Sequence, residues 1–373
     1  MVALLLLASC ADRSLGGDGE ADTTDATEGS DATELVSPYL LMSIGGVLYA
    51  GHSETEALTP LPLDPPEVDR AFSGCTPDGR AFVRRVATPD DRELRLVDTA
   101  TMTERVLPVP SGASAAHVLP DRTAVAVSIP DETFYADYTT YDVLVVATDG
   151  GGELWRTQTP WIVERPLAAS PDSRWWAVSY EVLSEPHVIE TIEAGVRLYP
   201  ARGGEYVEFA IGSEEIRSAQ WLSNSRQLLV AAEDEIYLVD VDTAEASKLV
   251  SGLDFRSGPD DDHLALRVTQ QHQGPAPDSA DVDLVLRLSD PQLTHHDFLD
   301  AEPGYGFTPE GWSPDGARLL ASWTVLPQNA APDREFQWWI VDEDGADPHP
   351  IFVDTPYGVP QQVQWCDLSG FVP

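Results

Sequence analysis

Five aspartates follow a proline in short turns that recur along the chain, and a ring of such carboxylates could act as acid, base or cation ligand. The clearest copy is GWSPDGARLLASW, residues 311 to 323, where a tight turn leads into alternating apolar positions. Aspartate accepts hydrogen bonds from backbone N–H groups in such turns, and proline presets φ. Because one residue type recurs at one turn position, we interpret these aspartates as structural. They are Asp78, Asp121, Asp172, Asp260 and Asp315.

The sequence offers little else that could form a catalytic or metal site. It has no G-x-S-x-G, H-E-x-x-H or C-x-x-C motif and no glycine-rich phosphate loop. Carboxylates alternate around a glycine at residues 342–347, as in calcium loops, but the twelve-residue loop with its terminal glutamate is missing. We therefore predict no cofactor, and calcium binding remains an alternative.

The recurring turns mark an internal repeat. The turn proline or its equivalent falls at positions 77, 120, 171, 223, 259, 314 and 367, so the spacing varies from 36 to 55 residues. Each unit contains short runs of β-branched and aromatic residues separated by Gly, Pro, Asp and Asn, which is typical of strands and turns. Four short strands with variable loops have this length, which is the unit of a β-propeller blade.

The two ends of the chain complement each other. The last unit, residues 365 to 373, leaves room for little more than one inner strand, and residues 39 to 61 can supply the missing strands. Such closure removes the open edge of the sheet. We predict an all-β chain with seven four-stranded blades and a ring closed by strands from both termini. Because the units are degenerate, six or eight blades remain alternatives.

The repeats with the pattern WSPDG resemble those of TolB-type propellers, which are related in architecture to WD-repeat proteins. The resemblance extends from about residue 38 to the C-terminus and implies the fold. It does not imply a function, because propellers include enzymes, ligand binders and scaffolds.

The N-terminus reads as a targeting segment. The apolar run at residues 2 to 9 is too short to span a bilayer, and Cys10 follows it directly. Residues 7 to 10 resemble the lipobox of bacterial lipoproteins, although no Lys or Arg precedes the run; an ordinary cleaved signal peptide is the alternative. The resemblance implies a signal peptide at 1–9, lipidation of Cys10 and a place in the bacterial cell envelope. The segment that follows has many acidic and small residues and no apolar periodicity, so we expect an acidic flexible tether at 10–37 and the propeller at 38–373.

The net charge of −41 restricts the partners. A polyanion gains no counterion release from nucleic acid, and anionic membrane surfaces repel it. We therefore expect no nucleic-acid partner and membrane contact only through the lipid. The expected partner is a protein or small ligand, with cationic or basic ones favoured, and the expected state is a monomer.

Four long loops between second and third strands should gather on one face of the propeller, and rigid scaffolds often place binding residues on such loops. The loops cover residues 130–142, 181–194, 269–281 and 324–336. We predict a non-catalytic binding scaffold. The alternative is a hydrolase or lyase with carboxylates near the axis. Convergence of three or more His, Arg or carboxylate side chains in a pocket at the axis would favour this alternative. The candidate binding-face residues are Phe134, Tyr135, Tyr138, Tyr141, His187 and His272.

Three tryptophans and two cysteines have structural interpretations. Trp221, Trp312 and Trp365 each precede a turn and should pack between blades. Cys75 and Cys366 fall at equivalent positions of the two units that meet where the ring closes. We consider a disulfide between them, with buried thiols as the alternative.

Overall fold

The computed structural model describes residues 39–63, 72–76, 78–87, 92–130, 141–157, 162–185, 188–212, 216–271, 278–285, 287–292, 294–325, 336–353, 355–356 and 359–368. The chain divides into two units, Met1–Leu35 and Val36–Pro373, and all described residues belong to the second. Cys10, the predicted signal peptide and the predicted tether lie outside the described residues.

The described residues form strands joined by turns. Within these ranges there is no helix, and therefore none long and apolar enough to cross a membrane. The strands are β1 (Tyr39–Ile44), β2 (Val47–His52), β3 (Leu58–Pro60), β4 (Ala81–Ala87), β5 (Arg92–Asp98), β6 (Thr103–Val106), β7 (Ser114–Val118), β8 (Ala124–Pro130), β9 (Tyr141–Ala147), β10 (Gly152–Arg156), β11 (Ile162–Ala169), β12 (Trp175–Glu185), β13 (Val188–Pro200), β14 (Val207–Gly212), β15 (Ile216–Trp221), β16 (Gln227–Ala232), β17 (Glu235–Asp240), β18 (Glu245–Ser251), β19 (Asp254–Ser257), β20 (Leu264–Gln270), β21 (Ser279–Val285), β22 (Thr294–Leu299), β23 (Tyr305–Trp312), β24 (Arg318–Val325), β25 (Phe336–Asp342), β26 (His349–Ile351) and β27 (Gln362–Trp365).

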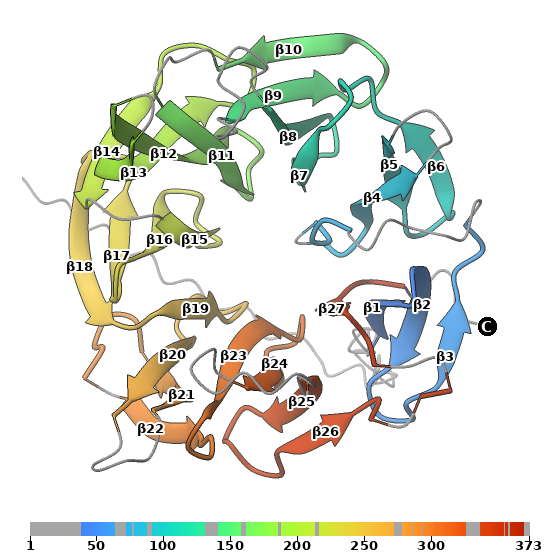
Figure 1. Ribbon diagram of the computed structural model, residues 1–373, viewed down its shortest axis with the longest axis vertical. Helices are drawn as coiled ribbons and strands as arrows, with labels where there is room; N and C mark the ends of the chain where they lie inside the picture. The colour runs from blue at the N-terminus through green and yellow to red at the C-terminus, as the bar shows by residue number, and fades with distance from the viewer. Residues whose placement is uncertain are drawn as a thin grey trace, which may run out of the picture. The chain divides into compact units, whose positions relative to one another are not determined.

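The strands form antiparallel sheets around a ring, with β7, β11, β15, β19, β23 and β27 toward its centre (Figure 1). Four sheets have four strands: β27-β1-β2-β3, β7 to β10, β11 to β14 and β15 to β18. Strands β4 to β6 form a fifth sheet, which an isolated bridge between Phe72 and Arg84 extends inward. The remaining strands form two successive meanders, β19 to β22 and β23 to β26, joined by one parallel pair between Ala280 and Gly306. The predicted all-β propeller is confirmed. The count of seven blades remains a prediction, since it takes the joined meanders as two blades.

Strands from both termini share one sheet, as predicted. Strand β27 pairs with β1 in antiparallel register, from Leu40 opposite Trp365 to Ser43 opposite Gln362. The Gln362 side chain also reaches the next sheet, where it donates to the carbonyl of Phe72 at 2.9 Å. The ring is therefore closed by pairing of the chain ends.

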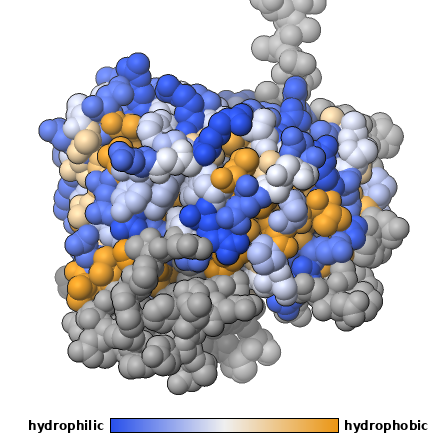
Figure 2. Space-filling model, turned by 90° about the horizontal axis from the view of Figure 1, so that it is seen from above, coloured by the Kyte–Doolittle hydropathy of each residue, from blue (hydrophilic) through white to orange (hydrophobic). Residues whose placement is uncertain are grey.

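The second strand of a sheet, counted outward from the centre of the ring, is buried on both faces because the sheet has a neighbour on either side. In β16, Leu228 and Val230 pack in one cluster with residues of β13, whereas Leu229 and Ala231 pack in another with residues of β20. Side chains alternate between the faces of a strand, so a continuous apolar run fits this position. The outer strand β18, in contrast, exposes four consecutive residues. Figure 2 shows a hydrophilic surface over much of the visible outer face.

The turn aspartates accept backbone hydrogen bonds, as predicted. Asp315 Oδ1 accepts the N–H of Ala317 at 3.1 Å and the hydroxyl of Ser313 at 2.5 Å. The corresponding oxygen of Asp172 accepts the N–H of Arg174 at 3.2 Å and the hydroxyl of Ser170 at 2.7 Å. These contacts explain the recurrence of the aspartates through turn geometry.

Neighbouring turns are also linked to each other. Ser173 and Ser225 have positive φ angles of 58° and 56°, and their hydroxyls accept backbone N–H groups of the preceding turn. The N–H of Asp121 donates to Ser173 at 2.9 Å, and the N–H of Asp172 donates to Ser225 at 3.0 Å. Each of these turns is therefore completed by a side chain of the next sheet.

The inner-strand tryptophans lie between sheets. The indole N–H of Trp312 donates to the carbonyl of Arg256 at 3.1 Å, and that of Trp365 donates to Gly311 at 3.2 Å. Both acceptors belong to the preceding inner strand. Trp221 is also buried, with 5% of its surface exposed. Their predicted role in packing between blades agrees with these positions.

One predicted loop is wrong. We expected residues 181–194 to leave the sheet, but β12 continues to Glu185 and β13 begins at Val188. Pairing extends beyond the sheet body, with Val182 opposite Glu193 and Glu185 opposite Val188. β-Branched residues are frequent in this stretch and favour an extended hairpin. The prediction gave too much weight to the length of the segment and too little to its β propensity.

The closing seam contains a disulfide between Cys75 and Cys366, whose Cα atoms are 5.9 Å apart. Beside it, Gly79 adopts a φ of +69° in the first turn and lies against the backbone of Asp367. A Cβ atom at Gly79 would meet the amide nitrogen of Asp367. Glycine is therefore required there both by conformation and by contact.

We expect Gly79→Ala to lower the free energy of unfolding by about 2 to 4 kcal/mol, because left-handed strain and a backbone clash act together. Gly45→Ala is the matched control, since Gly45 has a φ of +57° and open space around its Cβ position. That control should lose about 1 kcal/mol. Urea denaturation of both variants measures the difference, and equal losses would contradict the role of the seam contact.

Candidate functional site

Most of the predicted binding-face residues cannot be placed. Phe134, Tyr135, Tyr138, His187 and His272 lie outside the described residues. Tyr141 is the first residue of β9, where its backbone pairs with Pro130. The binding face at the long loops therefore stays a prediction.

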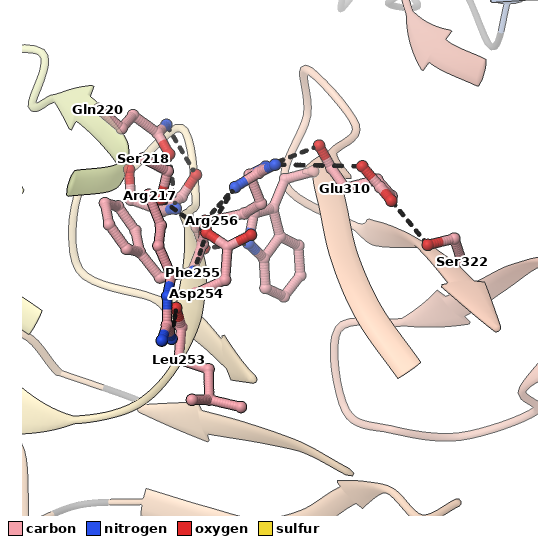
Figure 3. Close-up of polar contacts among 11 residues, drawn as sticks. Arg217, Ser218, Gln220, Leu253, Asp254, Phe255, Arg256, Glu310 and Ser322 are labelled. Carbon is pink, nitrogen blue, oxygen red and sulfur yellow. Dashed lines mark hydrogen bonds and ion pairs between the residues drawn. The ribbon is translucent and has the colours of Figure 1, made fainter. Parts of the chain in front are cut away.

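A polar network instead joins the inner strands β15, β19 and β23. The hydroxyl of Ser218 donates to Asp254 Oδ1 at 2.6 Å, and Arg256 Nη1 lies 3.2 Å from the same oxygen. Arg256 Nε donates to the backbone carbonyl of Glu310 at 3.0 Å. Figure 3 shows the Arg256 guanidinium between Asp254 and Glu310. Three charged side chains thus converge on the inner strands.

Glu310 lies at an irregularity of β23. The residues on either side of it pair with Ala321 and Leu320 of β24, so Glu310 has no partner in this ladder. A bulge of this kind redirects a side chain away from the regular alternation. Glu310 Oε1 accepts a 2.6 Å hydrogen bond from the hydroxyl of Ser322 on β24, which fixes the carboxyl group.

Burial raises the pKa of the Glu310 carboxyl, and repulsion from Asp254 acts in the same direction. Arg256, Ser322 and Arg267 oppose this shift because they favour the ionised form. Arg256 Nη2 approaches Glu310 Oε2 only to 4.0 Å, and both side chains are 28% exposed. The carboxyl group is therefore sheltered and only loosely paired.

A cavity of about 490 Å³ opens beside this pair. It combines two opposite charges, three carboxamides and an apolar wall, which is the composition of many small-molecule sites. Its lining residues come from β19, β23, β25, β27 and the residue before β27: Arg256, Glu310, Phe336, Trp338, Gln361, Gln362, Val363 and Gln364.

Some lining groups retain hydrogen-bonding capacity, whereas others are used by the fold. Gln362 bonds the backbone of the Phe72 segment, and the indole N–H of Trp338 donates to Pro360 at 2.8 Å. Within the described ranges, the side chains of Gln361 and Gln364 form no hydrogen bond, and Arg256 Nη2 and Glu310 Oε2 have only their mutual 4.0 Å contact. The cavity thus offers donors and acceptors to a ligand or to water.

A second charged cluster uses its capacity internally. Arg197 of β13 is 4% exposed and donates to Glu164 at 2.7 Å and to Glu208 at 2.8 Å. Its guanidinium carbon lies 4.5 Å from the ring centre of Tyr180 and 4.7 Å from that of Tyr206. With paired charges and aromatic faces around it, the Arg197 guanidinium is fully used within its own sheet and offers nothing to a ligand.

The described side chains contain no group of three or more His, Cys, Asp or Glu that could hold a metal ion. In the acidic run at 342–347, Asp344 accepts the N–H of Ala346 at 2.9 Å and Asp342 lies 3.8 Å from Arg318. These contacts are those of a hairpin turn and an ion pair. Calcium binding therefore receives no support from this part of the structure.

The sequence analysis missed Asp254, Arg256 and Glu310. The available signal was the charge in two inner-strand segments, DFRS and TPEGW, but the inner strands IVERPLAA and IRSAQW also carry charges. That signal does not show which charges meet, because Arg256 and Glu310 lie 54 residues apart on different strands and come together only in the folded ring.

No protein-family model matches the chain, and no curated protein sequence matches it. Several solved structures, in contrast, have a similar fold. The tricorn protease matches with a TM-score of 0.55 and 10% identity, over 89% of this chain and 34% of its own. The oligogalacturonate lyase from Vibrio parahaemolyticus matches with a TM-score of 0.54 and 15% identity, over 79% of this chain and 83% of its own. TolB from Acinetobacter baumannii matches at 12% identity, over 89% of this chain and 67% of its own, and its TM-score of 0.47 is too low to support an argument. At these identities the likeness shows the fold alone.

The raised pKa of Glu310 should appear in the pH dependence of stability. Below pH 4.5, the ordinary pKa of a glutamate, both folded and unfolded states hold the proton. Above pH 4.5 the unfolded state ionises freely, whereas the folded state must ionise a sheltered carboxyl. The free energy of unfolding of the wild type should therefore fall with rising pH relative to that of Glu310→Gln. Urea unfolding between pH 4 and 8 measures this difference. The exposed Glu302→Gln on the same segment is the control, and parallel curves for the two variants would contradict the assignment.

Proposed function

We propose that this chain is a non-catalytic binding propeller that holds a small polar ligand in the cavity between β19, β23 and β27. The observation that carries the proposal is the convergence of Arg256, Glu310, Gln361 and Gln364 on one cavity with hydrogen-bonding capacity to spare. A rigid ring of sheets holds these groups in place, which lowers the entropic cost of binding.

The location of the protein forms a second part of the proposal. We infer a seven-bladed domain anchored in a bacterial cell envelope through lipid on Cys10, with the acidic segment at 10–37 as tether. The order of apolar run, small residues and cysteine supports this reading. The acidic surface would favour cationic or basic protein partners over anionic ones.

One observation favours a second candidate function, an enzyme with an axial carboxylate. Glu310 has a raised pKa and faces a cavity beside a guanidinium, as a general acid would. If Glu310 is catalytic, a bound compound should be converted by the wild type and left intact by Glu310→Gln. Mass spectrometry of the recovered compound distinguishes catalysis from binding.

Ligand-observed NMR on the full chain, with a mixture of neutral sugars, sugar acids, amino acids and polyamines, tests the binding function. At least one compound should show saturation transfer from the wild type, and Gln364→Trp should abolish it by filling the cavity. Gln337→Trp is the control, because Gln337 lies between Phe336 and Trp338 on β25 but does not line the cavity. Identical signals in both variants, or none from the wild type, would contradict the proposal.

The anchor is tested by labelling cells that express the full chain with an alkynyl fatty acid. Wild-type protein should carry the label and sediment with membranes. Cys10→Ala should be unlabelled and at least tenfold depleted from the membrane fraction, because it lacks the lipid whose buried CH₂ groups provide the membrane affinity. Labelling of Cys10→Ala at the wild-type level would exclude this anchor.

A further inference from the structure

We infer that the cavity beside Arg256 and Glu310 is built for a neutral saccharide. This inference rests on the proposed binding function and names the chemical class of its ligand. It starts from a donor and an acceptor that lie side by side: Arg256 Nη2 and Glu310 Oε2 are 4.0 Å apart and share no hydrogen bond with each other. Adjacent hydroxyls of a sugar can both donate and accept, so one diol can satisfy both groups.

The two charged groups are held in position without the ligand. Glu310 is fixed through its other oxygen by Ser322 at 2.6 Å. Arg256 is fixed by the carbonyl of Glu310 at 3.0 Å and by Asp254 at 3.2 Å. Each side chain thus uses part of its capacity for anchoring and presents the remainder to the cavity. Such preorganisation is what a weakly hydrophobic ligand requires, because its binding depends on correctly placed hydrogen bonds.

The other walls suit the same ligand. Gln361 and Gln364 also line the cavity, and the Gln364 carboxamide lies against Gly74. A carboxamide offers both a donor and an acceptor, and neither side chain has a hydrogen bond among the described residues. Phe336 provides apolar surface and is backed edge to face by Trp338, which is 4% exposed and whose ring centre lies 5.2 Å away. A sugar ring presents C–H faces to an aromatic wall and hydroxyls at its edge. The volume of about 490 Å³ lies within the range of small-molecule sites.

Charge favours a neutral ligand over an ionic one. Arg256 and Glu310 balance each other, so the lining has no net formal charge. The chain as a whole carries −41, which opposes the approach of sugar acids. Polyamines would have to bind next to Arg256, with Arg267 close enough to Glu310 to affect its titration. A zwitterionic amino acid could match the charge pair but would leave the two carboxamides without partners.

Isothermal titration calorimetry of the full chain tests the inference with glucose, galactose, mannose, maltose and cellobiose, and with galacturonic acid and glycine as the ionic probes. At least one neutral sugar should bind at least tenfold more tightly than either ionic probe. Gln364→Ala should weaken it at least fivefold, and Gln337→Ala should leave it unchanged. Gln364 has no hydrogen bond to lose in the described part of the chain, but its carboxamide packs against Gly74, so urea unfolding of the variant checks that the fold is retained.

The remaining outcomes separate the inference from the function on which it rests. Tighter binding of galacturonic acid or glycine, lost in Gln364→Ala, would overturn the saccharide assignment and leave the binding function standing. Sugar binding that is equal in Gln364→Ala and wild type would overturn the assignment of this cavity. If no probe binds and the NMR mixture also gives no signal dependent on residue 364, both proposals fall.

Discussion

Pairing of β27 with β1 is the contact on which the ring depends. Every other sheet of consecutive strands can form from one stretch of chain, but the sheet of β1, β2 and β3 obtains its inner strand from the other end of the sequence. Without that strand, an inner edge would remain open and the neighbouring sheets would lose one packing partner. The disulfide and the contact of Gly79 with Asp367 lie at the same seam. Covalent, steric and hydrogen-bonding constraints therefore coincide at one place.

The same inner strands that define the ring also position the candidate site. Their backbones are fixed by pairing on one side and by turn and tryptophan contacts with neighbouring sheets. Arg256 illustrates this, because its carbonyl accepts the indole N–H of Trp312 while its guanidinium lines the cavity. A site built from strands inherits the rigidity of the fold. Binding specificity at the cavity would thus depend on side-chain identity more than on loop movement.

Local patterns predicted the parts of this structure that each unit repeats. The turn around Asp315, the position of Trp312 and the complementarity of the chain ends follow from short-range chemistry and from one repeated spacing. Glu310 could not be placed in this way, because a bulge removes it from the alternation of its strand. Its pairing with Arg256 depends on the packing of two successive meanders, and the two residues are 54 positions apart in sequence. The extended hairpin of β12 and β13 was missed for a different reason, since strand propensity continued where length suggested a loop.

Because β1 pairs with β27, the ring can close only after β27 has been synthesised. During synthesis, β1 is made before the other described strands and has five of its six residues destined for burial, whereas its partner β27 follows all of them. The turns at Asp121 and Asp172 likewise wait for a serine of the sheet that follows. The nascent chain therefore carries an apolar strand edge until β27 has been made, and an unpaired edge of this kind invites association with other chains. A propeller closed by its two ends needs protection of its first strand for as long as the last one is missing.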